Sequence, residues 1–203
     1  MALANFGDLK TSIQSFLNRS DLTSYIPDFV KLAESRINYG SSDPLKSEPL
    51  RIPAMQARVT VTSPVTFPSD FLEVIRLTAT SGSTTWKLTY ADTGTFTDLS
   101  NSSDLPTVYT FLNNTIETAG TGVATFSLDY YSSFDALTLD ADTNWLLTNS
   151  PQIYLFGALL ESAPFISDMP MVTAWHGMYK SALNSLNLKA KSPGGGSMQV
   201  RAR

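Results

Sequence analysis

The sequence predicts an α+β protein, in which a helical bundle carries an inserted small antiparallel β region and an extended C-terminal arm. Near both ends of the chain, apolar residues recur at intervals of three and four, as they do on one face of an α-helix. In the middle of the chain they alternate with polar residues, as in strands with one buried face. With 203 residues, of which 42% are apolar, the chain can bury a substantial core.

The strongest helical signal lies in residues 149–188, which predict two antiparallel neighbouring helices joined by a short connection. Ser150 is expected to cap the first helix, and Pro151 suits its first position. Residues 153–160 contain no charge, which is typical of a helix buried on all sides. The second helix has Asp168 as its expected cap and a continuous apolar stripe. We expect the core of this helical hairpin to contain Ile153, Phe156, Leu160, Trp175 and Tyr179.

Two further helices are predicted within residues 5–40. The apolar face of the first includes Phe16, and the apolar face of the second ends at Ile37. Glu34 is expected to point away from that second face, and Gly40 to end the helix. The next residues, up to position 56, contain three prolines and are expected to form an irregular connection.

The β insertion is expected to span about residues 57–135. Residues 86–90 alternate as one strand, and residues 108–118 resemble a hairpin that turns at Asn113 and Asn114. Residues 93–99 are predicted to form one short helix between strands.

Residues 1–188 are expected to form a single domain, with helical parts at about 5–40 and 149–188, followed by a flexible basic arm at 189–203. The arm contains four basic residues and no acidic residue, so its charge is +4, whereas the whole chain has a net charge of −4. The preceding 188 residues therefore carry −8. The predicted hinge of the arm consists of Pro193, Gly194, Gly195 and Gly196. Beyond it, apolar and polar residues alternate as in a strand added to a partner's sheet. The expected docking residues are Met198, Val200, Arg201 and Arg203.

The composition argues against several kinds of chemistry. The chain has no cysteine, which excludes disulfides and thiolate sites. His176 is the only histidine and no Gly-x-Ser-x-Gly turn is present, so no catalytic residue is expected. Asp140, Asp142 and Asn144 have the spacing of a calcium loop but lack its glycine and its closing acid, so we expect a polar turn, no metal and no cofactor. The N-terminus lacks the features of a signal peptide, which predicts a protein that stays in the cytoplasm and binds no membrane.

One ordered set of segments is similar to a known family. Residues 143–151 (Thr-Asn-Trp-Leu-Leu-Thr-Asn-Ser-Pro) lead into residues 154–164 (Tyr-Leu-Phe-Gly-Ala-Leu-Leu-Glu-Ser-Ala-Pro), and Trp175 and Tyr179 follow. Earlier landmarks are Phe-Val-Lys-Leu-Ala-Glu-Ser-Arg-Ile-Asn at 29–38, Leu-Glu at 72–73 after Pro-Ser-Asp, and Leu-Asp-Tyr-Tyr at 128–131. In this order and spacing, most of residues 5–188 resembles the head–tail adaptor proteins of short-tailed bacteriophages.

The resemblance implies a structural protein of the virion neck, assembled in the host cytoplasm, rather than an enzyme. Such adaptors form a ring, commonly of twelve copies, beneath the portal of the capsid, join it to the tail nozzle and complete the DNA channel. The implied partners are the portal protein, the tail nozzle or hub protein, further copies of the chain, and genomic DNA that passes without sequence specificity. The arm could dock on the portal or on a neighbouring copy, or its arginines could face the DNA.

Three other functions stay open at this point: another ring component such as a tail terminator or nozzle protein, a small hydrolase, and a carbohydrate-binding module. The missing nucleophile motif opposes the hydrolase. A carbohydrate-binding module would need several aromatic residues on one exposed strand face, and only Trp86 and Tyr90 approach this. We expect no basic patch beside Tyr130 and Tyr131, which disfavours sequence-specific binding of nucleic acid.

Overall fold

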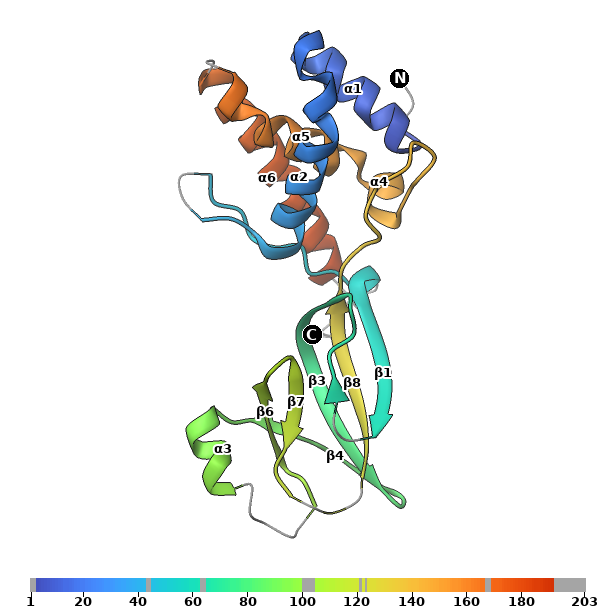
Figure 1. Ribbon diagram of the computed structural model, residues 1–203, viewed down its shortest axis with the longest axis vertical. Helices are drawn as coiled ribbons and strands as arrows, with labels where there is room; N and C mark the ends of the chain where they lie inside the picture. Colours follow the sequence, from blue (N-terminus) through green and yellow to red (C-terminus); the bar gives the residue numbers. More distant parts are fainter. Residues whose placement is uncertain are drawn as a thin grey trace, which may run out of the picture. The chain divides into compact units, whose positions relative to one another are not determined.

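A computed structural model describes residues 3–42, 45–62, 65–99, 105–120, 122, 124–166 and 169–191. The chain divides into two compact units (Figure 1). The helical unit comprises Met1–Ala54 and Phe134–Arg203, and the β unit comprises Met55–Ser133. Both helices and sheets are present, so the fold is α+β, as the sequence predicts. The β unit begins and ends two residues earlier than the predicted insertion.

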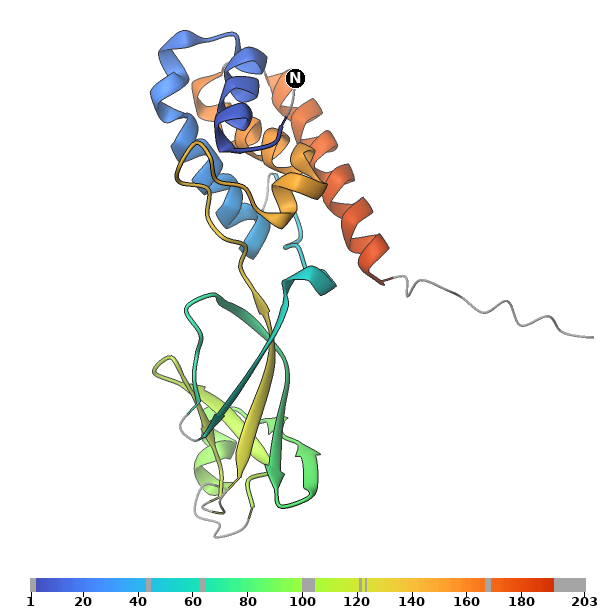
Figure 2. The same ribbon diagram turned by 90° about the vertical axis from the view of Figure 1, so that its right-hand side faces the viewer.

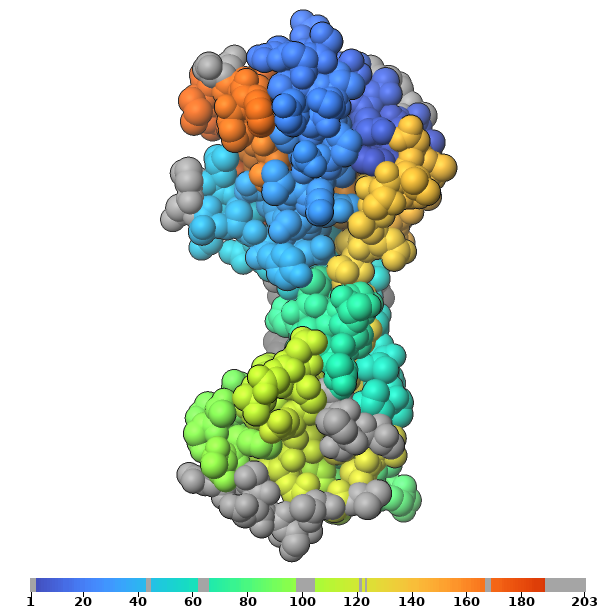
Figure 3. Space-filling model, in the orientation of Figure 1, coloured from blue at the N-terminus to red at the C-terminus, as the bar shows by residue number. Residues whose placement is uncertain are grey.

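The helical unit is assembled around one buried helix, α5. Its elements are α1 (Phe6–Leu17), the 3-10 helix η1 (Ser20–Tyr25), α2 (Ile26–Tyr39), α4 (Trp145–Asn149), α5 (Pro151–Glu161), the 3-10 helix η3 (Ala163–Phe165) and α6 (Met169–Lys191). A further 3-10 helix, η2 (Pro53–Met55), precedes the first strand. Helix α5 packs against α1, α2, α4 and α6. Figure 2 shows the long helix α6 in side view, and Figure 3 shows the surface of α2 in blue.

The close approach of three helices depends on Gly157. A Cβ atom added there would lie 3.1 Å from the Cβ of Ala33 on α2 and 3.4 Å from the ring of Tyr179 on α6. Ile153, Leu160, Trp175 and Tyr179, four of the five residues expected in this core, are buried. Phe156 is only half-buried, because it shares the least buried face of α5 with exposed Gln152, one turn earlier.

Two expectations about the helical residues, for Phe16 and Glu34, are wrong, and the one for Ser150 is confirmed in position only. Phe16 is half-exposed on α1 rather than part of its buried face. Ser150 does occupy the N-cap position of α5, with Pro151 as the first helical residue, but its side chain makes no capping bond. At α4, in contrast, the Asn144 side chain accepts a hydrogen bond from the Leu147 N–H at 2.9 Å. Glu34 does not point to solvent but accepts a hydrogen bond from the Leu137 N–H at 3.0 Å. Asp168, the expected cap of α6, lies outside the described residues.

Helix α2 ends as the sequence predicts. Gly40 has a φ of 75°, a conformation that favours glycine, and a Cβ atom there would lie 2.7 Å from the carbonyl oxygen of Ser47. The chain therefore leaves α2 sharply and enters the proline-containing connection.

The β unit contains two four-stranded sheets. Its strands are β1 (Gln56–Thr62), β2 (Val65–Thr66), β3 (Phe71–Ser81), β4 (Thr84–Lys87), β5 (Thr89–Tyr90), β6 (Val108–Leu112), β7 (Thr115–Thr118) and β8 (Thr125–Ser132). The first sheet has the order β1-β8-β3-β4 and the second β2-β7-β6-β5. Leu77, Ile116, Phe126 and Leu128 belong to the core cluster that both sheets share.

Two local predictions for this unit are confirmed. Strands β6 and β7 form an antiparallel hairpin, and Asn113 and Asn114 both have positive φ at its turn, as a tight two-residue hairpin turn requires. Residues Thr93–Leu99 form the short helix α3.

Two other predictions need correction. Residues 86–90 are not one strand, because Leu88 enters the core and separates β4, in the first sheet, from β5, in the second. The β region is not antiparallel throughout, since β5 pairs with β6 in parallel.

Candidate assembly surfaces

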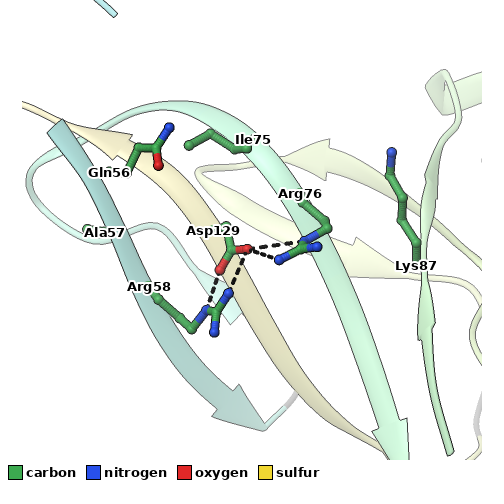
Figure 4. A pocket seen from close by; sticks show the side chains of 7 residues that line it. All are labelled: Gln56, Ala57, Arg58, Ile75, Arg76, Lys87 and Asp129. Atoms are coloured by element: carbon green, nitrogen blue, oxygen red, sulfur yellow. Dashed lines mark hydrogen bonds and ion pairs between the residues drawn. The ribbon is translucent and has the colours of Figure 1, made fainter. Parts of the chain in front are cut away.

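The outer face of the first sheet carries a compact ionic cluster. Arg58 on β1 and Arg76 on β3 lie directly opposite Asp129 on the central strand β8. Arg58 donates from Nε to Oδ1 at 2.5 Å and from Nη2 to Oδ2 at 3.0 Å. Arg76 donates to Oδ2 from Nη2 at 2.6 Å and from Nε at 3.1 Å. One carboxylate thus joins three neighbouring strands (Figure 4).

The strand alternation explains why these groups point outward. Leu128 and Tyr130 flank Asp129 on β8 and face the core, so Asp129 lies on the opposite face of the sheet. Hydrogen bonds from Arg58, and then from Arg76, hold the pKa of Asp129 below its usual value. Asp129 is therefore ionised at neutral pH.

A shallow hollow lies beside this cluster. It has a volume of about 520 Å³ and is also lined by Gln56, Ala57, Ile75 and Lys87. Ile75 reaches it because the register between β3 and β8 shifts between Val74 and Arg76, which leaves Ile75 as an extra, bulged residue. Three basic side chains and one acidic side chain give this surface, which we name the basic face, a charge of +2.

Aromatic side chains line a second hollow of about 300 Å³ in the β unit. Its aromatic lining is Phe71, Tyr90, Tyr109 and Phe111, and the ring of Tyr90 contacts those of Tyr109 and Phe111. Trp86 does not take part in this lining, because its ring nitrogen donates to the carbonyl oxygen of Pro106 at 2.7 Å and its ring packs on the core. The two residues named for a carbohydrate-binding face therefore do not form one platform.

The helical unit exposes an apolar stripe along α2. Tyr25, Leu32 and Tyr39 recur at intervals of seven and are all exposed. The ring of Phe165, itself half-exposed, contacts those of Tyr25 and Phe29 at 5.6 and 5.5 Å between centroids. Exposed aromatic residues of this kind are enriched at protein interfaces.

The residues considered for other chemistry have structural partners. A ring nitrogen of His176 lies 3.1 Å from the carbonyl oxygen of Lys46. Asp142 accepts hydrogen bonds from Thr138 and Leu139, and Asp140 pairs with Lys10. Within the described residues, no three His, Asp or Glu side chains gather in a way that could hold a metal ion. In the same part of the chain, every helix is too short or too polar to cross a membrane.

A family model described as SU10 adaptor protein matches residues 4–201. The chain belongs to this family of phage head–tail adaptors. No curated protein matches the chain. The resemblance inferred from the order of segments in the sequence is thereby confirmed, and the family indicates a structural adaptor of a bacteriophage virion rather than an enzyme.

The docking arm of this phage adaptor is predicted to follow α6. All eight of its named residues, from Pro193 to Arg203, lie outside the described residues. Helix α6 continues to Lys191, three residues beyond the predicted end of the helical part.

The basic face was not predicted from the sequence, and neither Tyr130 nor Tyr131 lines it. Arg58 and Arg76 bind Asp129 on the outer face of β8, whereas Tyr130 faces the core. The sequence does contain one signal for an outward-facing charged surface, because each of these charged residues occupies a polar position of an alternating strand. The register that brings the strands together was not available from the sequence.

Proposed function

We propose that the protein forms a closed ring of twelve copies beneath the portal of a phage capsid, where it joins the portal to the tail nozzle and extends the DNA channel. The single observation that carries this proposal is the family match across residues 4–201. The exposed stripe on α2 and the basic face of the β unit support it, because a ring subunit needs different surfaces for its two neighbours.

In this proposal the two units act together as one adaptor, and DNA passes the ring without being held. Residues 1–188 carry a net charge of −8, which opposes tight binding of a polyanion. Genomic DNA is thus a passing partner without sequence specificity, and the protein needs no cofactor. Assembly takes place in the host cytoplasm, and the mature protein resides in the virion neck.

The arm is proposed to dock on the portal or on a neighbouring copy. Met198 and Val200 would fill apolar pockets, while Arg201 and Arg203 would meet acidic groups. Pro193, Gly194, Gly195 and Gly196 would let the arm leave α6 in a different direction.

Deletion of residues 192–203 tests the arm. We expect the truncated protein to fold like the full chain but to bind purified portal rings more weakly, as measured by biolayer interferometry, and virions assembled with it to lose DNA. A matched control replaces Arg201 and Arg203 by Lys, which keeps the charge and should keep most of the binding. Unchanged portal binding together with unchanged DNA retention would overturn the docking role of the arm.

Quantitative mass spectrometry of purified virions tests the wider proposal. The protein should be present in as many copies as its ring requires, close to the number of portal subunits. Virions that lack the protein, or contain a single copy, would contradict a ring.

A further inference from the structure

The basic side chains of the β unit gather on one surface. Residues 55–133 contain three basic residues, Arg58, Arg76 and Lys87, and seven acidic ones. All three basic residues line the hollow of the basic face, together with Asp129. Of the other six acidic residues, Glu73 lies on β3 beside the aromatic hollow, and Asp92 and Glu117 lie on the side of the second sheet.

The opposite outer face of the unit is acidic. On β7, Ile116 lies in the core cluster shared by the two sheets, so the next residue, Glu117, lies on the outer face of the second sheet. Helix α3 covers this same face, because its Phe96 packs with Val108 and Ala119. Asp92, at the start of α3, is exposed and accepts hydrogen bonds from the N–H groups of Gly94 and Thr95.

The unit thus has a basic face on its first sheet and an acidic face, defined by Asp92, Glu117 and α3, on its second. Both faces belong to one compact body with a shared core, so they point in different directions. Such a body has complementary surfaces for another copy of itself. A contact of this kind is heterologous, and it repeats from copy to copy until a ring closes.

We propose that the basic face of one copy binds the acidic face of the β unit in the next copy. The occupant of the basic face is therefore a second copy of this chain, and the contact is one of the subunit interfaces of the ring. This inference rests on the proposed ring and assigns its charged contact to named residues. Charge complementarity would set the direction and register in which copies associate.

The surroundings of the cluster favour a protein surface over DNA phosphates. Asp129 accepts from Nε and Nη2 of both arginines, which leaves their remaining N–H groups and Lys87 for an acidic partner. Exposed Ile75 adds an apolar contact to the hollow, which suits a protein partner. Outside this face, residues 1–188 carry −10, because their total is −8 and the face contributes +2.

Lys87 allows a direct test, because it is the only lysine in residues 55–133. Full-length chains with natural and ¹⁵N isotopes are mixed, assembled on portal rings and treated with a carbodiimide, which joins an amine to a carboxylate at contact distance. Mass spectrometry should find Lys87 joined to Glu117, Asp92 or another carboxylate of the acidic face, in peptides of mixed isotope content. Links of Lys87 only within one chain, only to the portal, or to no carboxylate would overturn the assignment.

Charge reversal gives an independent test. Lys87→Glu should raise the protein concentration needed for ring formation on the portal by about tenfold or more, and addition of Glu117→Lys chains should restore part of the loss. Lys180→Glu, which makes the same charge change at an exposed position of α6, is the control and should have little effect. Ring formation by Lys87→Glu at the wild-type concentration would overturn the inference, as would weaker DNA binding with unchanged ring formation.

The two proposals fail in different ways. If the wild-type chain forms no ring on the portal under any condition, the proposed function is wrong. If the ring forms normally while Lys87 is not linked to another copy, only the assignment of this contact is wrong.

Discussion

The helical unit and the β unit place their charged residues in different environments. In the helical unit, Arg36 and Glu161 form an ion pair between α2 and α5 with side chains only 13% and 17% exposed. In the β unit, the side chains of Arg58 and Arg76, which bind Asp129, are 62% and 49% exposed. Exposed ion pairs contribute little to stability, whereas a buried charge that loses its partner is strongly destabilising.

The comparison assigns different roles to the two sets of charges. Arg36 also donates to the Ser41 hydroxyl at 2.7 Å and to the carbonyl oxygen of Leu45 at 3.0 Å, so it fastens the connection after α2 to the helices. Arg58 and Arg76 also join segments through Asp129, but these are adjacent strands that backbone pairing already holds together, and the cluster lies on an outer surface. We infer that the charges of the helical unit maintain the fold, while those of the basic face remain available for contacts.

The largest expected effect is that of removing Arg36. Arg36→Leu leaves Glu161 without its partner and should lower the free energy of unfolding by about 3 kcal/mol, measured by urea denaturation. Arg19→Leu, which breaks the exposed pair with Asp21, is the matched control and should leave the unfolding midpoint nearly unchanged. Equal losses for the two variants would break the comparison.

The tight interior of the helical unit predicts a difference between two glycines. Gly177→Ala on α6 meets no atom within 4 Å and should stabilise the protein by up to about 1 kcal/mol through higher helix propensity. Gly157→Ala gains the same propensity but places a Cβ 3.1 Å from that of Ala33, so it should be about 1–3 kcal/mol less stable than Gly177→Ala. If thermal unfolding ranks the two variants alike, the close approach at Gly157 is unimportant.

The pH dependence of stability should reveal Glu34. Burial raises the pKa of Glu34, and the hydrogen bond from Leu137 opposes this only in part. The folded-state pKa of Glu34 therefore lies above its unfolded-state pKa. Its ionisation lowers the stability of the folded protein, and this loss is absent in acid and develops as the pH rises from the unfolded-state pKa through the folded-state pKa. Glu34→Gln should therefore be more stable than the wild type at pH 7, and this advantage should disappear in acid. An advantage that is the same at both pH values would point to a cause other than ionisation.

The smallest effect is expected for Asp129. Since hydrogen bonds from Arg58 and Arg76 lower its folded-state pKa, its contribution is present at neutral pH and lost as the pH falls through that value. Asp129→Asn should lower the free energy of unfolding at pH 7 by no more than about 1 kcal/mol, and less in high salt, because both arginines are exposed. A loss as large as that of Arg36→Leu would show that the cluster maintains the fold.

Local patterns predicted much of the fold because their signals lie within short segments. The Asn113-Asn114 turn, the helix at residues 93–99 and the stop at Gly40 each depend on residues next to one another, and each is observed. The change of sheet at Leu88 could not be predicted in this way, because the alternation from Trp86 to Tyr90 is the same as in a single continuous strand. Phe16 and Glu34 were misplaced for the same reason, because their environment is decided by distant segments.

The candidate surfaces depended even more on tertiary structure. Arg58, Arg76 and Asp129 lie far apart in the sequence, and only the register of β1, β8 and β3 places them together. The bulge at Ile75 could not be predicted, because no glycine or proline marks it in the sequence. Family membership, in contrast, was accessible from the sequence because it is carried by the order and spacing of many segments.

Electron microscopy of the full chain mixed with purified portal rings tests the central claim most directly. The account predicts class averages in which a second closed ring, with cyclic symmetry, is stacked on one face of the portal around an open channel. Portal rings without added density, or with a single bound copy, would contradict the assignment of this chain as a ring-forming head–tail adaptor.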